Sequence, residues 1–97
     1  MDVRSEDAGP FDLNQTARRA ALLLHGFTGT PYEMRPLGEK LAERGIRAVG
    51  HRLAGHGGSP DELAKTSYRD WIAGADDALA RLRTEAERVA VVGLSLA

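Results

Sequence analysis

Cysteine is absent from the 97-residue sequence, and aromatic residues make up only 5% of it. The lack of cysteine excludes disulfides and thiolate metal sites. The formal net charge is −1, and Lys and Arg form no cluster with interleaved aromatic residues, so we expect no nucleic acid partner. No apolar run approaches the length of a membrane span, so stable membrane insertion is not expected.

The composition is that of an ordinary globular protein, because 42% of the residues are hydrophobic and 28% are charged. The first residues are charged and lack the apolar core of a signal peptide, so a cytoplasmic location is the expectation. Residues 1–10 are polar and aperiodic, which predicts a flexible N-terminal arm. Residues 11–97 are then expected to form part of a single domain.

Four short segments have strand patterns. Residues 11–13 alternate like a short edge strand, and residues 20–24 form an apolar run typical of a strand covered on both faces. Residues 46–50 are a weaker candidate because an arginine interrupts them, and the β-branched residues 89–92 predict a buried strand. Separated by helical segments, these strands predict a layered α/β sheet with parallel pairing and right-handed crossovers.

The first predicted helix follows residues 25–31. Thr30 is the expected N-cap, with Pro31 at the first helical position and Glu33 closing a capping box. Pro36 lacks an N–H donor, which predicts a kink or a short first turn followed by a restarted helix ending near Arg44.

Two further helical segments are predicted. Residues 61–65 can form one turn, and a longer helix begins after Ser67 and runs to about Thr84. Its apolar face is expected to contain five residues at helical spacing: Trp71, Ala75, Ala78, Leu79 and Leu82.

The chain ends in Gly93-Leu94-Ser95-Leu96-Ala97, directly after the last predicted strand. A serine on a sharp strand-to-helix turn stands clear of the sheet, and the close approach of the flanking elements favours small residues two places before and after it. Gly93 meets the first condition, and Ala97 takes the place usually held by glycine. Ser95 is therefore a candidate nucleophile, the alternative being a structural serine that caps the next helix.

A second motif, His25-Gly26-Phe27-Thr28-Gly29, follows the apolar strand at residues 20–24. Its two glycines predict a tight turn at the carboxyl edge of the sheet, where open α/β folds bind ligands. Such a turn can direct a backbone N–H at an oxyanion, and the residue after the nucleophile supplies a second donor. We assign these donors to the backbone amides of Phe27 and Leu96.

Five stretches together resemble the α/β-hydrolase superfamily, above all its small bacterial carboxylesterases and monoacylglycerol lipases. They are residues 22–31, residues 34–38, Leu53-Ala54-Gly55-His56-Gly57, Asp70-Trp71 and residues 92–96. The resemblance implies a three-layer, mostly parallel α/β-hydrolase-type sheet, of which residues 11–97 are the N-terminal portion. It also implies a serine carboxylester hydrolase acting on a small-molecule ester through an acyl-enzyme on Ser95.

In this superfamily the acid and the histidine of the triad follow the serine, so both are expected beyond Ala97. The full-length parent is predicted to be the enzyme, and the 97 residues alone are expected to be inactive. His25, Gly26, Gly93 and His56 are assigned supporting roles in the site loops, and His51 is interpreted as a loop residue. No grouping of residues has metal-ligand spacing or resembles a phosphate cradle, so no metal or cofactor is implied.

Two other interpretations stay open at this point. The same scaffold could support a thioesterase, a cofactor-free haloperoxidase or a carbon-carbon hydrolase, because fold does not fix function. A truncated chain without catalytic activity is the alternative from a different class. The serine itself argues against haloalkane dehalogenases, which resemble this family but use an aspartate at the elbow.

Overall fold

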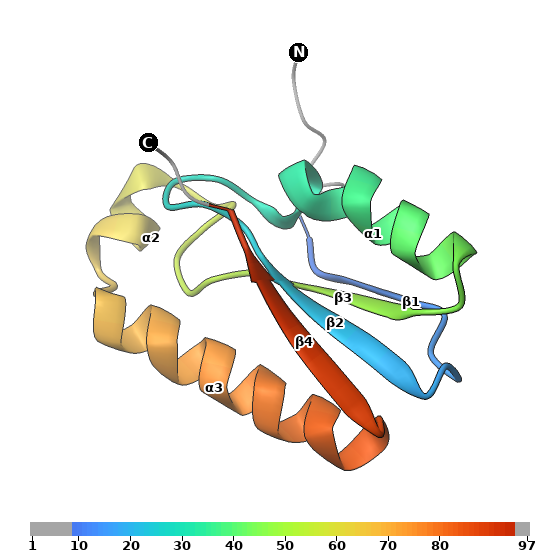
Figure 1. Ribbon diagram of the computed structural model, residues 1–97. Coiled ribbons are helices and arrows are strands. Elements are labelled where there is room, and N and C mark those ends of the chain that lie inside the picture. Colours follow the sequence, from blue (N-terminus) through green and yellow to red (C-terminus); the bar gives the residue numbers. More distant parts are fainter. Residues whose placement is uncertain (1–8, 95–97) are drawn as a thin grey trace.

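The computed structural model describes residues 9–94 (Figure 1). The elements, in chain order, are β1 (Phe11–Leu13), β2 (Arg19–Leu24), a 3-10 helix η1 (Pro31–Met34), α1 (Arg35–Glu43), β3 (Arg47–His51), α2 (Pro60–Ala64), α3 (Tyr68–Glu85) and β4 (Arg88–Gly93). The domain boundaries at residues 1–10 and 11–97 remain predictions, and most of the N-terminal arm, together with Ser95, Leu96 and Ala97, lies outside the described residues.

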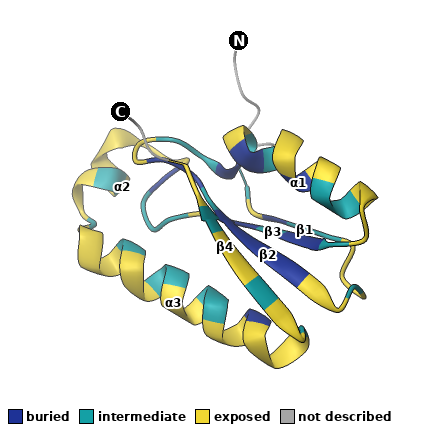
Figure 2. Cartoon of the chain, in the orientation of Figure 1, coloured by how far each residue is buried: buried dark blue, intermediate teal, exposed yellow. Residues whose placement is uncertain are grey.

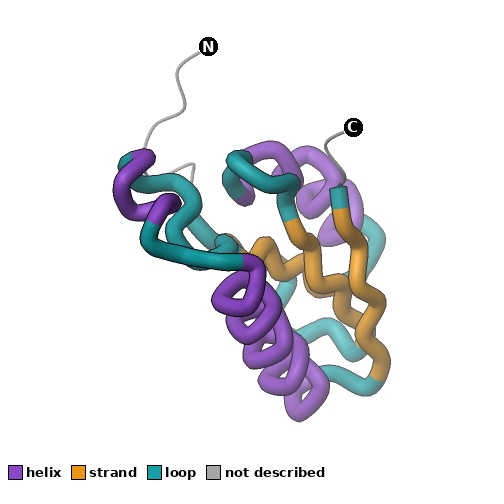
Figure 3. Tube along the Cα trace, turned by 90° about the vertical axis from the view of Figure 1, so that its left-hand side faces the viewer, coloured by secondary structure: helices purple, strands orange, loops and turns teal. Residues whose placement is uncertain are grey.

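The four strands form one sheet in the order β1-β3-β2-β4. β2 pairs in parallel with β3 on one side and with β4 on the other, whereas β1 pairs antiparallel with β3. Figures 1 and 3 show α1 and α3 on opposite faces of this sheet. The predicted three-layer, mostly parallel α/β architecture is therefore confirmed.

Strand β2 supplies the centre of the core on both faces. Ala21 and Leu23 pack with Phe11, Met34 and Ala48 in one buried cluster. Ala20 and Leu22 alternate with them and pack against Leu82 of α3 in a second cluster. Leu22 is 1% exposed and Leu23 is fully buried, which confirms the prediction of a strand covered on both faces.

The helix after the first turn begins as predicted around Pro36. A 3-10 turn over Pro31–Met34 precedes α1, and Pro36 lies in the first turn of α1, where its missing N–H removes no helical hydrogen bond. The predicted capping box is wrong, because Thr30 makes no side-chain cap hydrogen bond and the Glu33 carboxylate binds elsewhere. At the other end, Gly45 adopts φ +80°, as expected for the residue after a helix.

The two later helices match the predictions within a residue or two. Ser59 caps α2 by accepting a hydrogen bond from the Glu62 N–H at 3.2 Å. At the start of α3, the Asp70 carboxylate accepts a hydrogen bond from the Ser67 N–H at 2.9 Å. Within the described residues, no helix is long and apolar enough to cross a membrane.

Strand β4 differs from its prediction as a buried strand. Most of its residues are exposed, Val91 by 50% (Figure 2). β4 is an edge strand of the described sheet, because it pairs with β2 and with no other described strand. The β-branched run therefore identified the strand correctly, while its side chains are less buried in the described sheet than predicted.

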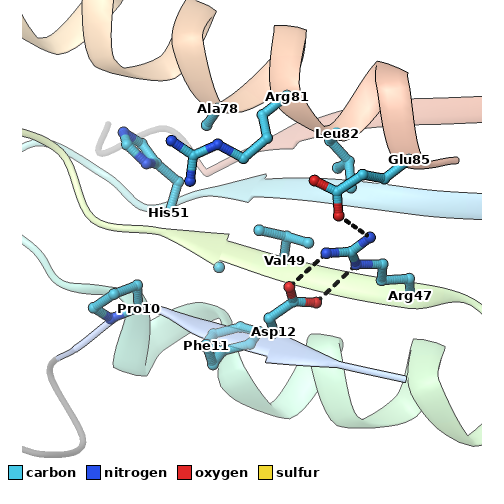
Figure 4. A pocket seen from close by; sticks show the side chains of 11 residues that line it. Pro10, Phe11, Asp12, Arg47, Val49, His51, Ala78, Arg81, Leu82 and Glu85 are labelled. Carbon is cyan, nitrogen blue, oxygen red and sulfur yellow. Dashed lines mark hydrogen bonds and ion pairs between the residues drawn. The ribbon is translucent and has the colours of Figure 1, made fainter. Parts of the chain in front are cut away.

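Arg47 joins three elements on the α3 side of the sheet. Its guanidinium donates to both carboxylate oxygens of Asp12, at 2.9 and 2.6 Å, and to Glu85 at 3.0 Å (Figure 4). These two acids hold the pKa of Arg47 above its usual value. The pairs border a cavity of about 410 Å³ between β1, β3 and α3, away from the residues predicted to carry chemistry.

The Phe11 ring occupies the space that side chains would take at two glycines. A Cβ at Gly50, which faces Phe11 across the β1–β3 pair, would overlap the ring, and a Cβ at Gly38 of α1 would lie 2.7 Å from it. Neither glycine has a positive φ. Their absent side chains, rather than backbone freedom, make room for the aromatic ring.

We predict that Gly50→Ala lowers the free energy of unfolding by about 1–3 kcal/mol, because the added methyl group meets the Phe11 ring. Chemical denaturation of the full-length protein measures this change. In a Phe11→Leu background the same substitution should cost clearly less, since the smaller side chain leaves room for the methyl group. Strictly additive losses in the double variant would contradict this account.

Candidate active site

Three strand ends meet at one edge of the sheet. Leu24 of β2 pairs with His51 of β3 and with Gly93 of β4, so all three strands end at the same level. The Leu94 N–H extends this pairing by donating to the Leu24 carbonyl at 3.0 Å. His25 therefore begins the turn after β2 beside the end of β4, and the candidate nucleophile Ser95 is the next residue in the chain after Leu94.

The turn after β2 closes with a hydrogen bond from the Gly29 N–H to the Gly26 carbonyl at 2.9 Å. The prediction that glycine supplies the unusual backbone conformation is wrong, because the positive φ of +68° lies at Thr28. A β-branched residue with positive φ is strained by roughly 1–3 kcal/mol. A Cβ at Gly29 would lie 2.7 Å from the Glu33 carboxyl carbon, so a side chain there would displace the carboxylate that binds the Gly26 N–H.

Glu33 occupies the amide that precedes Phe27 in the turn. Its Oε1 atom accepts a hydrogen bond from the Gly26 N–H at 2.5 Å. Within residues 9–94, by contrast, the Phe27 N–H meets no acceptor. Sequence reasoning assigned Glu33 to a helix cap, and its spacing to Thr30 fits that role equally well, so the sequence held no signal for the contact with Gly26.

His25 is buried and uses both ring nitrogens. Nδ1–H donates to the Gly26 carbonyl at 2.8 Å, and Nε2 accepts from the Leu53 N–H at 3.1 Å. Because a carbonyl only accepts and an amide only donates, these two bonds require the neutral Nδ1–H tautomer. Burial lowers the pKa of His25, and the nearby His56 and Arg52 act in the same direction.

The other two histidines lie in or after β3. His56 is 3% exposed, and its Nδ1–H donates to the Ala54 carbonyl at 3.0 Å. The Nε2 atoms of His56 and His51 are buried and have no hydrogen-bond partner in the described part of the chain. Burial also lowers the pKa of His51, and the proximity of His25 adds to this effect.

Four rings form a cluster over the turn: His25, Phe27, His56 and Trp71. Phe27 lies 4.7 Å from Trp71 and 5.6 Å from His56, measured between ring centroids. The Trp71 ring also meets His56 edge-on at 5.2 Å. Sequence reasoning placed Trp71 on the apolar face of its helix and missed this cluster, because ring contacts between separate elements depend on the tertiary fold.

A small hollow of about 250 Å³ lies beside the turn, lined by Thr28, His56 and residues 57–60, with Gly55 and Leu63. No group of His, Asp or Glu suited to holding a metal ion occurs within residues 9–94.

Apart from the chain neighbours of Gly93, no described atom lies within 4 Å of a Cβ built at this glycine. The described residues therefore show no contact that supports its predicted role. Gly26 is buried in the turn.

The mostly parallel sheet lies between two layers of helices, and a tight turn follows its strand β2. This architecture places the chain among doubly wound α/β proteins. The sequence profile described as the alpha/beta hydrolase family matches residues 21–97. The chain belongs to this family, and its fold is that of the N-terminal part of an α/β hydrolase.

Two relatives and one solved structure are similar over most of the chain. A thermostable monoacylglycerol lipase of Bacillus sp. (strain H-257) is 40% identical over 75 residues, which are 77% of this chain and 30% of the lipase. A carboxylesterase of Bacillus subtilis (strain 168) is 43% identical over 79 residues, 80% of this chain and 32% of the esterase.

The solved structure comes from work on LipS and LipT, two metagenome-derived lipolytic enzymes. It is 36% identical, with a TM-score of 0.86, and the match covers 92% of this chain and 36% of that one. The 97 residues thus span about a third of the length of the proteins they match.

The lowered pKa of His25 gives a prediction for stability against pH. At a given pH near 6.5, His25 is less protonated in the folded protein than in the unfolded chain, where its pKa is the ordinary 6.5. The neutral His25 therefore stabilises the folded state above pH 6.5, and this stabilisation is lost as the pH falls below that value. We expect His25→Gln to lose less unfolding free energy than wild type between pH 7 and pH 5, because glutamine does not titrate in this range.

Denaturant titrations of the full-length protein at each pH measure this difference. Lys40→Gln, which alters a largely exposed side chain in α1, is the control and should follow the wild-type pH profile. Equal losses in wild type and His25→Gln would contradict the prediction. His51 should leave a residual slope in the variant, because burial lowers its pKa too.

Proposed function

We propose that the full-length protein is a serine carboxylester hydrolase of the carboxylesterase or monoacylglycerol lipase type, with Ser95 as nucleophile. The observation that carries the proposal is the turn after β2, whose Phe27 N–H meets no described acceptor at the sheet edge where β4 ends. The names of the two Bacillus relatives support an ester as substrate. Short-chain or monoacylglycerol-like esters are the substrate class we infer.

In the proposed reaction, Ser95 Oγ attacks the ester carbonyl carbon while a base takes the hydroxyl proton. The backbone amides of Phe27 and Leu96 donate to the carbonyl oxygen, which becomes negatively charged. Collapse of the intermediate expels the alcohol, protonated by the same base, and leaves an acyl group on Ser95. A water molecule then releases the acid by the reverse sequence of proton transfers.

The contacts of the described histidines support a base elsewhere in the full-length protein. Both nitrogens of His25 already bind backbone groups, and His56 Nδ1 binds Ala54. The remaining Nε2 atoms of His56 and His51 are buried. A catalytic base must reach the serine proton, so we place the acid and the histidine of the triad beyond Ala97 and infer that the 97 residues alone are inactive.

Glu33 supports the assignment of Phe27 as a donor. Because Glu33 occupies the Gly26 N–H, that amide is unavailable to substrate and the next amide in the turn is left for the oxyanion. One oxyanion donor contributes about 3–4 kcal/mol to transition-state stabilisation. The proposed site therefore depends on a carboxylate that never touches the substrate.

We predict that Ser95→Ala in the full-length protein abolishes the burst of p-nitrophenol from p-nitrophenyl butyrate. The steady-state kcat should fall on the order of 10⁴-fold or more, because no acyl-enzyme can form. Stopped-flow absorbance measures the burst. Thr84→Ala, which removes an exposed hydroxyl in α3, is the control and should retain it. An unchanged burst in Ser95→Ala, or turnover of thioesters without any oxygen ester, would refute the proposal.

A further inference from the structure

The side chain of Phe27 is held by two rings that come from different elements. His56 belongs to the loop after β3, and Trp71 lies in the first turn of α3. The Trp71 ring is tilted by 37° to the Phe27 ring, and His56 meets Phe27 nearly edge-on at 69°. Such offset and edge-on pairs are attractive beyond the area they bury. Phe27 itself remains 47% exposed, so these contacts restrain a side chain that is otherwise open.

Each of the two restraining rings is fixed at its polar end. Trp71 Nε1–H donates to Thr66 Oγ1 at 2.9 Å, and the Thr66 hydroxyl donates in turn to the Leu63 carbonyl at 2.8 Å. His56 Nδ1–H donates to the Ala54 carbonyl at 3.0 Å. These bonds set the orientation of both rings, which a purely apolar contact would leave free to rotate.

The backbone around Phe27 needs such a restraint. The Gly26 carbonyl, in the same peptide plane as the Phe27 N–H, accepts from His25 Nδ1 and from the Gly29 N–H, whereas on the other side of Phe27 the backbone continues into Thr28, which has a positive φ of +68°. His25 and Glu33 hold the Gly26 side of the turn. Within residues 9–94, the ring contacts are what holds the Phe27 side chain.

We propose that His56 and Trp71, the latter through Thr66, are positioning residues that hold Phe27 so that its N–H points at the developing oxyanion. This inference rests on the proposed function. It assigns a purpose to the buried His56, whose Nε2 makes no described hydrogen bond. The contribution of the cluster is then greater in the transition state than in substrate binding, because only the transition state carries the oxyanion.

The test compares variants of the full-length protein in steady-state hydrolysis of p-nitrophenyl butyrate. His56→Asn keeps a donor near the position of Nδ1 but removes the ring, and Trp71→Leu removes the indole. Each should lower kcat about 10-fold with KM changed less than twofold, less than the 10²–10³-fold effect of deleting an oxyanion donor. Ile72→Ala, a change at a 55% exposed neighbour of Trp71, is the control and should leave kcat unchanged.

Thr66→Val keeps the test informative if the larger substitutions impair folding. Valine has the shape of threonine but cannot accept the Trp71 Nε1–H, so kcat should fall several-fold while Thr66→Ser, which retains Oγ1, recovers most of it. In a Phe27→Ala background, which keeps the amide but lacks the ring, His56→Asn should have no further effect on kcat.

Three outcomes would overturn the positioning role. The first is a raised KM with unchanged kcat in His56→Asn and Trp71→Leu, which would make the rings part of a substrate-binding wall. The second is full additivity of His56→Asn with Phe27→Ala, and the third is wild-type kcat in Thr66→Val. Each can be told apart from failure of the proposed function, in which Ser95→Ala keeps its burst. Loss of the burst in Ser95→Ala together with normal kcat in Thr66→Val would reject the positioning role alone.

Discussion

The parallel pairing of β2 on both of its sides is the constraint on which the rest of the structure depends. Because parallel strands run in the same direction, the carboxyl ends of β2, β3 and β4 must lie at one edge of the sheet. Every residue assigned to the candidate site follows one of these ends or packs on the loops between them. The pairing holds because β2 is apolar on both faces and fills the centre of two core clusters.

In the turn after β2, polar contacts occupy some backbone amides and leave others, Phe27 among them, without a described acceptor. Glu33 accepts from Gly26, the Gly26 carbonyl receives bonds from Gly29 and from His25, and Phe27 is left without a described acceptor. His25 also binds Leu53, so the turn and the loop after β3 are held together. The candidate site thus combines amides that are occupied with the Phe27 amide, which is proposed as the oxyanion donor.

Much of the fold could be predicted because its signals are local. The apolar run before His25 identified a strand covered on both faces, and Pro36 indicated the restart of the helix. The β-branched run identified β4 as a strand, but the run by itself does not show how far its side chains are covered in the described sheet. The site turn was located, but the partner of Glu33 and the positive φ of Thr28 depend on contacts that spacing alone leaves ambiguous.

The ion pairs of Arg47 link segments that are far apart in the chain. Asp12 is 35 residues away in sequence and Glu85 is 38 residues away on the other side. The Arg47 guanidinium therefore has both of its carboxylate partners only when β1 and the C-terminal end of α3 are both packed against β3. Detachment of either segment would leave a buried cation half paired, so local opening at β1 and fraying at the C-terminal end of α3 are energetically coupled. A single side chain thus links the opening of two segments that are distant in sequence.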